Sequence, residues 1–253
     1  SLDSQAITEL GPGAEPERLA VLHARRCKWR SYSALVSPIG RQDLEYAVSL
    51  LADRPASSAR ARVLAEYAKF LVHDGVADAE VERLAQQSFD EARLVSDLQA
   101  ELHATLVLAS VAFQRGSVEE GSARLAQLRR LDVAPETGVV PAFGQRSAVL
   151  ESDALEGLGL HRPAAAAARL GVALPAGRGW SKGQSLILAV NLAEPLNALG
   201  EWDEAIQVAR RALDLQPPAT KQAWLNYLLG EAHLHKGDLT VAAEHVAEAR
   251  RLR

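Results

Sequence analysis

The sequence predicts an all-α protein in which about six helical pairs stack into a right-handed solenoid. Alanine, leucine and arginine are abundant and aromatic residues make up only 5% of the 253 residues. This composition favours helix over strand because such side chains lose little freedom in a helix. A helix–turn–helix pattern also occurs twice, in one register, between Leu186 and Leu252. One pair cannot bury its apolar face alone, so the pattern predicts a stack of pairs.

The two copies align on Gly200 and Gly237. Mostly apolar or small residues stand eight, seven and four positions before each glycine and five, nine and twelve positions after it. They are Leu192, Ala193, Leu196, Ala205, Ala209 and Ala212 in one copy, and Leu229, Gly230, His233, Ala242, Val246 and Ala249 in the other. Residues three or four apart share one helix face, and small ones let a neighbouring helix approach closely. We expect each glycine to end its first helix in the left-handed conformation.

The rest of the chain divides around this pattern. Residues 1–16 are expected to be a flexible lead-in, and residues 17–253 form one helical-repeat domain. A divergent first pair occupies residues 17–55, with helices at about 17–36 and 41–53 separated by Ser37 to Gly40. Five repeats follow at residues 58–95, 97–131, 142–174, 181–216 and 218–252. Two loops, at 132–141 and 175–179, are marked by proline.

Two repeats depart from the register. Glu80 takes the position of Ala205, which predicts either a remodelled turn at Val76 to Asp78 or a looser contact. Glu151 and Ser152 stand where the fourth pair should have apolar and small residues. Separately, Pro195 lies within a predicted helix and should kink it near Asn191, because proline removes a backbone hydrogen bond.

Charge and composition exclude several classes of protein. A net charge of −4 and a pI near 6.0 argue against a domain that grips a phosphate backbone. The single cysteine, Cys27, allows no internal disulfide, and no apolar run is long enough to span a bilayer. The N-terminal segment resembles neither a secretion signal nor an anchor. We therefore expect a cytoplasmic location with no membrane contact, and the lack of methionine suggests a piece of a longer polypeptide.

A family resemblance rests on NLAEPLNALGEWDEAIQVARRALDLQPPATKQAWLNYLLGEAHLHKGDLTVAAEHVAEARRL. This stretch resembles the tetratricopeptide-repeat (TPR-like) region of large ATP-binding transcriptional regulators of the LuxR type, the MalT-like group. The resemblance extends more weakly through ARARVLAEYAKFL and GSVEEGSARLAQL, over roughly residues 58–252. The glycines recur every 37 to 43 residues, longer than the roughly 34 of a tetratricopeptide repeat, but the pattern of glycine and alanine favours that class.

The resemblance implies a non-catalytic scaffold or sensor module within such a regulator. The alternative is a stand-alone adaptor that assembles other proteins. In the family a nucleotide-binding switch precedes the repeats and a helix-turn-helix domain follows them. No G-x-x-x-x-G-K-[ST] motif occurs here, and the glycine-rich stretch Gly177 to Gly183 has the wrong spacing for phosphate. We therefore predict no enzyme activity, no cofactor and no direct nucleic acid binding for this segment.

Candidate site residues come from the first helices, whose exposed positions should line a concave groove. No catalytic constellation is assigned, and His233 and His235 are two residues apart, so no metal site is predicted. The basic run Arg25 to Arg30 is interpreted as a solvated helix face. The predicted binding residues are Asn191, Glu194, Asn197, Trp224, Tyr227, Glu231 and His235.

A protein, peptide or small-molecule effector in the groove is the expected partner, because large amphipathic rings beside an acid and an imidazole suit such a ligand. The sequence leaves open whether Trp224 and Tyr227 face the groove or the core. It also leaves open whether the chain forms a homo-oligomer.

Overall fold

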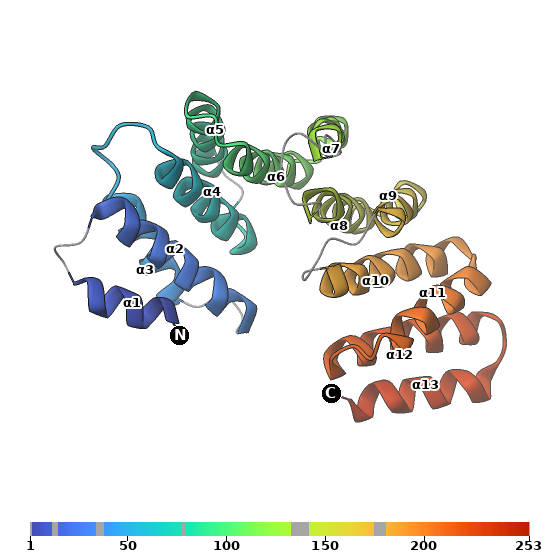
Figure 1. Ribbon diagram of the computed structural model, residues 1–253. Helices are drawn as coiled ribbons and strands as arrows, with labels where there is room; N and C mark the ends of the chain where they lie inside the picture. Colours follow the sequence, from blue (N-terminus) through green and yellow to red (C-terminus); the bar gives the residue numbers. More distant parts are fainter. Residues whose placement is uncertain are drawn as a thin grey trace. The chain divides into compact units, whose positions relative to one another are not determined.

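A computed structural model describes residues 2–11, 15–33, 38–76, 79–132, 142–174 and 181–252. These residues form thirteen α-helices joined by turns (Figure 1). The predicted all-α class and the stacking of helical pairs are confirmed. None of the helices in the described part of the chain is both long and apolar enough to cross a membrane.

The chain forms two compact units, residues 1–124 and 125–253. Unit 1 contains α1 (Leu2–Leu10), α2 (Pro16–Ser33), α3 (Pro38–Ser49), α4 (Ser58–His73), α5 (Ala79–Leu94), α6 (Leu98–Gln114) and the start of α7 (Val118–Asp132). Unit 2 contains the end of α7, then α8 (Ala142–Gly157), α9 (His161–Ala173), α10 (Ser181–Leu199), α11 (Trp202–Asp214), α12 (Ala219–His235) and α13 (Leu239–Arg251).

Within each unit the helices pack in the order expected of a solenoid. The first helix of a pair contacts its own partner and the first helix of the next pair: α4 packs on α5 and α6, and α10 packs on α11 and α12. The first helices therefore lie side by side. They are α2, α4 and α6 in unit 1, and α8, α10 and α12 in unit 2 (Figure 1).

Five pairs turn in the same way. Their turn glycines all have positive φ: Gly75 +79°, Gly116 +78°, Gly159 +72°, Gly200 +78° and Gly237 +85°. The residue after each glycine donates its N–H, at 2.9 Å, to the carbonyl oxygen four residues before the glycine. This is the Schellman arrangement, which satisfies a carbonyl left over at the helix end and needs a left-handed residue. The predicted role of the glycines is confirmed.

Small residues lie where the helices of unit 2 approach most closely. Ala193, Ala205 and Ala209 are at most 2% exposed within a cluster built from α9 to α12. A Cβ atom added at Gly171 would lie 2.6 Å from the Cβ of Ala148, and one added at Gly230 would lie 2.9 Å from Cγ2 of Val246. The helix backbones are therefore too close for larger side chains.

The N-terminal region differs from the sequence-based expectation. Residues 2–10, expected as part of a flexible lead-in, form α1, which packs on α2. Asp3 is 7% exposed and lies 3.6 Å from the guanidinium of Arg25. An acid in the first turn also favours a helix electrostatically. The expected breaker at Pro38 instead lies in the first turn of α3, where the missing proline N–H costs no hydrogen bond.

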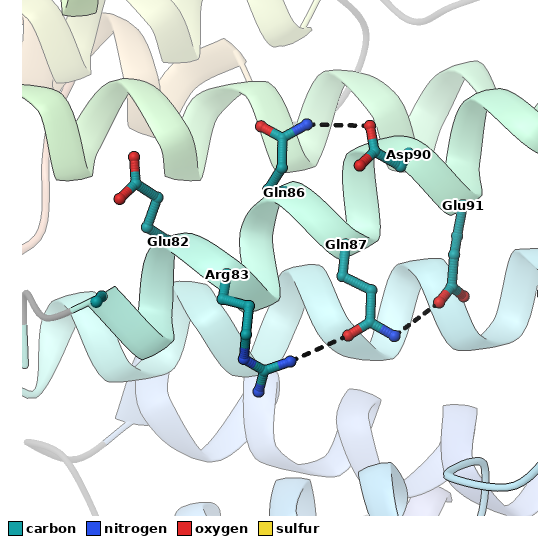
Figure 2. A pocket seen from close by; sticks show the side chains of 7 residues that line it. Glu82, Arg83, Gln86, Gln87, Asp90 and Glu91 are labelled. Atoms are coloured by element: carbon teal, nitrogen blue, oxygen red, sulfur yellow. Dashed lines mark hydrogen bonds between the residues drawn. The ribbon is translucent and has the colours of Figure 1, made fainter.

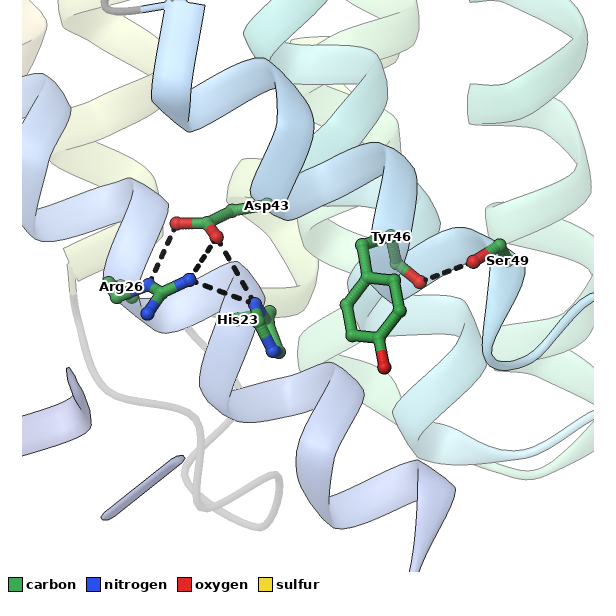
Figure 3. A network of polar contacts seen from close by, with 5 residues as sticks. All are labelled: His23, Arg26, Asp43, Tyr46 and Ser49. Carbon is green, nitrogen blue, oxygen red and sulfur yellow. Dashed lines mark hydrogen bonds and ion pairs between the residues drawn. The ribbon is translucent and has the colours of Figure 1, made fainter. Parts of the chain in front are cut away.

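The first pair is held together by a buried ion pair (Figure 3). Arg26 on α2 donates to both carboxylate oxygens of Asp43 on α3, and the Nδ1 of His23 lies 3.2 Å from the same carboxylate. Burial disfavours the charged form of Asp43, but the hydrogen bonds from Arg26 and His23 outweigh it and lower the pKa of the carboxyl group.

The two departures from the repeat register have structural explanations. Glu80 is exposed while Val81 is fully buried, so the apolar stripe of α5 is displaced by one residue. Ala77 and Asp78 of the preceding turn lie outside the described residues. In α8, Glu151 accepts a hydrogen bond from Arg129 at 2.7 Å, and the hydroxyl of Ser152 accepts one from Asn191 at 3.0 Å. These polar residues are buried because each has a partner.

Other expectations are not tested. α10 runs from Ser181 to Leu199 through Pro195, and the kink remains a prediction. The expected loop at 175–179 and most of the loop at 132–141 lie outside the described residues.

Candidate ligand-binding wall

The wall formed by α8, α10 and α12 contains the predicted site. On α12, Trp224 is 46% exposed and Tyr227 is 53% exposed. The two rings are therefore on the surface and are not core residues, and their place in a binding groove remains a prediction. The ammonium group of Lys221 lies 5.2 Å from the centre of the Trp224 ring. This separation is typical of a cation–π contact, so one face of the ring already attracts positive charge.

Glu194 on α10 lies near several other carboxylates of the wall. Its side chain is half-buried, and within the described residues no group donates a hydrogen bond to it. Burial raises the pKa of its carboxyl group, and the nearby carboxylates of Glu156, Glu231 and Asp153 raise it further. All of the charges that shift this pKa are negative, so a carboxylate at this place lacks a favourable partner.

The two predicted asparagines connect neighbouring helices. Asn191 donates to the hydroxyl of Ser152 at 3.0 Å and to the carbonyl of Val149 at 3.3 Å, which joins α10 to α8. Asn197 is 5% exposed and donates to the carbonyl of Leu228 at 3.0 Å and to Oε2 of Glu231 at 2.9 Å, which joins α10 to α12. Asn197 lies beneath the wall, where it positions Glu231.

His235 lies at the end of α12, away from the two exposed rings. It stacks on Trp202, the first residue of α11, with ring centres 5.7 Å apart and planes inclined by 8°. The structure therefore brings Glu194, Trp224, Tyr227 and Glu231 onto one wall and places His235 against the turn of the preceding pair.

The corresponding wall of unit 1 is more nearly neutralised. Arg62 donates to Asp97 at 2.8 Å. Glu66 lies 3.7 Å from both Lys69 and His103. These opposite charges lie close enough to satisfy one another, so this wall offers less to a charged ligand.

Polar or charged side chains also gather at two other places on the chain. A surface depression of about 530 Å³ runs along α5 (Figure 2), but its polar side chains bond to one another: Gln86 to Asp90, Arg83 to Gln87, and Gln87 to Glu91. In the basic run, Arg25 and Arg26 pair with Asp3 and Asp43, and the side chains of residues 28–30 lie outside the described set. No metal-binding group of three ligands occurs among the residues described.

Comparison with known proteins identifies the fold but not a family. No protein-family model matches the chain, and no curated protein sequence matches it. Among solved structures, a Rap protein complexed with Competence and Sporulation Factor is similar with a TM-score of 0.70 and 15% identity, over 98% of this chain and 69% of that one.

Two further solved structures are similar. A Podosopora anserina putative kinesin light chain with nearly identical TPR-like repeats gives a TM-score of 0.55 and 18% identity, over 76% of this chain and 94% of that one. A Signal Transduction ATPase with Numerous Domains from Pyrococcus horikoshii, which has a tetratricopeptide repeat sensor, gives 0.65 and 12%, over 98% of this chain and 38% of that one. The chain thus has the fold of a TPR-like helical-repeat protein.

Proposed function

We propose that this chain is a non-catalytic TPR-like scaffold or sensor module, and that the face of α10 and α12 binds a protein, peptide or small ligand. One observation carries this proposal: two half-exposed aromatic rings lie on the same wall as a half-buried carboxylate that has no hydrogen-bond donor among the described residues. Exposed rings supply contact area at low entropic cost, and their N–H and O–H groups orient a partner.

The solved structures support a binding role by analogy of fold. One of them is a complex with Competence and Sporulation Factor, and another has its tetratricopeptide repeats as a sensor. The resemblance over residues 58–252 extends this proposal to the regulatory region of a LuxR-type transcriptional regulator. A stand-alone adaptor that mediates protein assembly is the second candidate. Reading the complete gene separates the two, because only the regulator has a phosphate-binding loop upstream and a helix-turn-helix domain downstream.

We infer binding rather than catalysis from the openness of the wall. The rings of Trp224 and Tyr227 are about half exposed to water, whereas active sites usually enclose most of their substrate and exclude water. The carboxylates around Glu194 repel one another. This group of acids, as far as the described residues show, does not place a nucleophile next to a base.

The binding role is tested by two substitutions on α12. Peptides are selected from a random display library on the wild-type chain, and their affinities are then measured for Trp224→Ala and Tyr227→Ala. We expect each substitution to weaken binding about tenfold or more, as loss of a central aromatic contact does. Thermal unfolding should change little because both rings are exposed.

The matched control is Leu170→Ala. Leu170 is 44% exposed on α9, which is the second helix of its pair in the same unit. The substitution therefore removes a similar exposed apolar surface away from the wall. If the selected peptides bind both α12 variants as tightly as the wild type, the proposed site is wrong.

A further inference from the structure

Three successive first helices of unit 2 carry a carboxylate at the same repeat position. Asp153 in α8, Glu194 in α10 and Glu231 in α12 each stand six residues before the turn glycine of their pair. Because α8 packs on α10 and α10 on α12, equivalent positions lie next to one another across the wall. Axes of packed helices are about 8 to 10 Å apart, so the three residues form a row of negative charge. We call this the carboxylate row.

The middle of the carboxylate row is electrostatically unfavourable without a ligand. Glu194 is half-buried between the other two acids, and Glu156 adds a fourth negative charge. All three neighbours raise the pKa of Glu194, which means that they destabilise its charged form. A positive group placed against Glu194 would reverse this effect, because an opposite charge stabilises the carboxylate.

A buried amide next to the row provides a second, independent indication. The side chain of Asn197 is 5% exposed, and its amide nitrogen donates to Oε2 of Glu231 and to the carbonyl of Leu228. Its Oδ1 is buried and has no donor in the described part of the chain. An unsatisfied buried acceptor is costly, so an N–H group that reached this atom through a shift of the side chains above it would be favourable.

The exposed rings extend the site along α12. Tyr227 and Trp224 precede Glu231 by four and seven residues on one helix face, which places them about 6 and 10 Å from it along the axis. An extended peptide rises about 3.3 Å per residue, so about three residues span the distance from the acid to Trp224. Lys221 lies over the Trp224 ring, so one face of this ring already makes a cation–π contact within the chain.

We propose that the carboxylate row and the two rings recognise a cationic peptide segment, with an arginine side chain opposite Glu194. A guanidinium carries five N–H donors in a planar fork, so one group can bond a carboxylate and an amide oxygen together and can also stack on an aromatic ring. This inference rests on the proposed function and names the chemistry of its ligand.

The test compares three rhodamine-labelled octapeptide pools by fluorescence anisotropy at pH 7.5. The pools are acetyl-capped and differ only at the fourth position, which is arginine, its neutral isostere citrulline, or glutamate. All other positions are equimolar mixtures of alanine, leucine, serine and tyrosine. We expect the arginine pool to bind about tenfold tighter than the citrulline pool, which is what one charge-assisted hydrogen bond contributes. The glutamate pool should bind most weakly.

Substitutions identify the groups responsible for the preference. Glu194→Gln and Glu231→Gln should each reduce the preference for arginine over citrulline at least about threefold, since each removes one charge from the row. The control is Glu244→Gln, which removes the same charge from an exposed position on α13. It should leave the preference unchanged.

The outcomes separate this inference from the proposed function. If all three pools bind equally and Trp224→Ala abolishes binding, the wall binds ligands but the cationic preference is wrong. The inference is also overturned if the preference for arginine survives both substitutions in the row, because the cation then binds elsewhere. If no pool shows saturable binding, the result contradicts both the inference and the proposed function.

Discussion

Small residues at fixed positions set the distance between the helices of a pair. Ala205 is 2% exposed and faces the core of unit 2, whereas Ala243 on α13 is exposed. We predict that Ala205→Leu lowers the free energy of unfolding by about 1 to 3 kcal/mol, the usual cost of overpacking. Chemical denaturation monitored by circular dichroism measures the change. Ala243→Leu is the matched control, and equal effects of the two substitutions would show that the register is wrong.

Glu194 provides a second prediction at the residue scale, because its folded pKa is raised above the ordinary value of 4.5. Above the folded pKa the charged carboxylate is penalised only in the folded state, so the folded chain gains stability as the pH falls through that pKa towards 4.5. Glu194→Gln should therefore raise the melting temperature at pH 7.5. The difference from the wild type should disappear below pH 4.5. A lower melting temperature at pH 7.5 would instead mean that Glu194 makes a stabilising contact.

At the scale of elements, the last pair contains a cluster of polar groups in its interface. The rings of His233 on α12 and His245 on α13 stack with centres 5.7 Å apart. Arg210 on α11 lies 3.4 Å from His233, and Asp238 in the turn lies 3.1 Å from it. His245 also bonds to the amide oxygen of Asn226 at 2.9 Å. The imidazole of His245 is therefore held in a polar interface between α12 and α13.

A pH dependence follows for the last pair. Burial lowers the pKa of His245 below 6.5, and the positive charges of His233 and Arg210 lower it further, while Glu244 opposes them. The neutral form stabilises the fold above pH 6.5, and this contribution is lost as the pH falls from 6.5 towards the folded pKa.

Thermal unfolding at pH 7.5 and pH 5.5 tests this dependence. The wild-type melting temperature should fall more between the two values than that of His245→Asn, which cannot titrate. Equal falls would exclude His245 as the cause.

The helices were predicted with unequal success, for physical reasons. A turn built on one left-handed glycine has a recognisable sequence pattern, so the residues around Gly200 and Gly237 predict α10 to α13. The ion pair between Asp3 of α1 and Arg25 of α2 joins residues far apart in sequence, so no local pattern reveals it. The displaced stripe of α5 shows the same limit, because a displacement of one residue along the helix changes which side chain is buried.

The candidate site shows a similar division. The three- and four-residue spacing places Trp224, Tyr227 and Glu231 on one face, but spacing alone does not tell surface from core. The burial of Asn197 depends on α12, a separate helix, and so was not predicted. Asp153 was missed although its signal was present: it occupies the same repeat position as Glu194.

At the scale of the whole molecule, each unit has its own core. The cluster that includes Leu192, Leu196 and Leu229 belongs to α9 through α12, and a separate cluster joins α4, α5 and α6. Repeat proteins are stabilised mainly by nearest-neighbour contacts. We predict that Ala205→Leu lowers the hydrogen-exchange protection of amides in α10 to α12 while amides in α4 and α5 keep theirs. A uniform loss of protection would show that the chain unfolds as one cooperative unit.

The most direct test of the binding wall is an NMR titration of the ¹⁵N-labelled chain with the arginine-bearing octapeptide pool. We expect the largest shift changes at the backbone amides around Glu194, Tyr227 and Glu231 and at the indole N–H of Trp224. Amides of α5, along the depression beside Arg83, should be unchanged. Saturable changes confined to α5, with the Trp224 indole unaffected, would contradict a ligand site on α10 and α12.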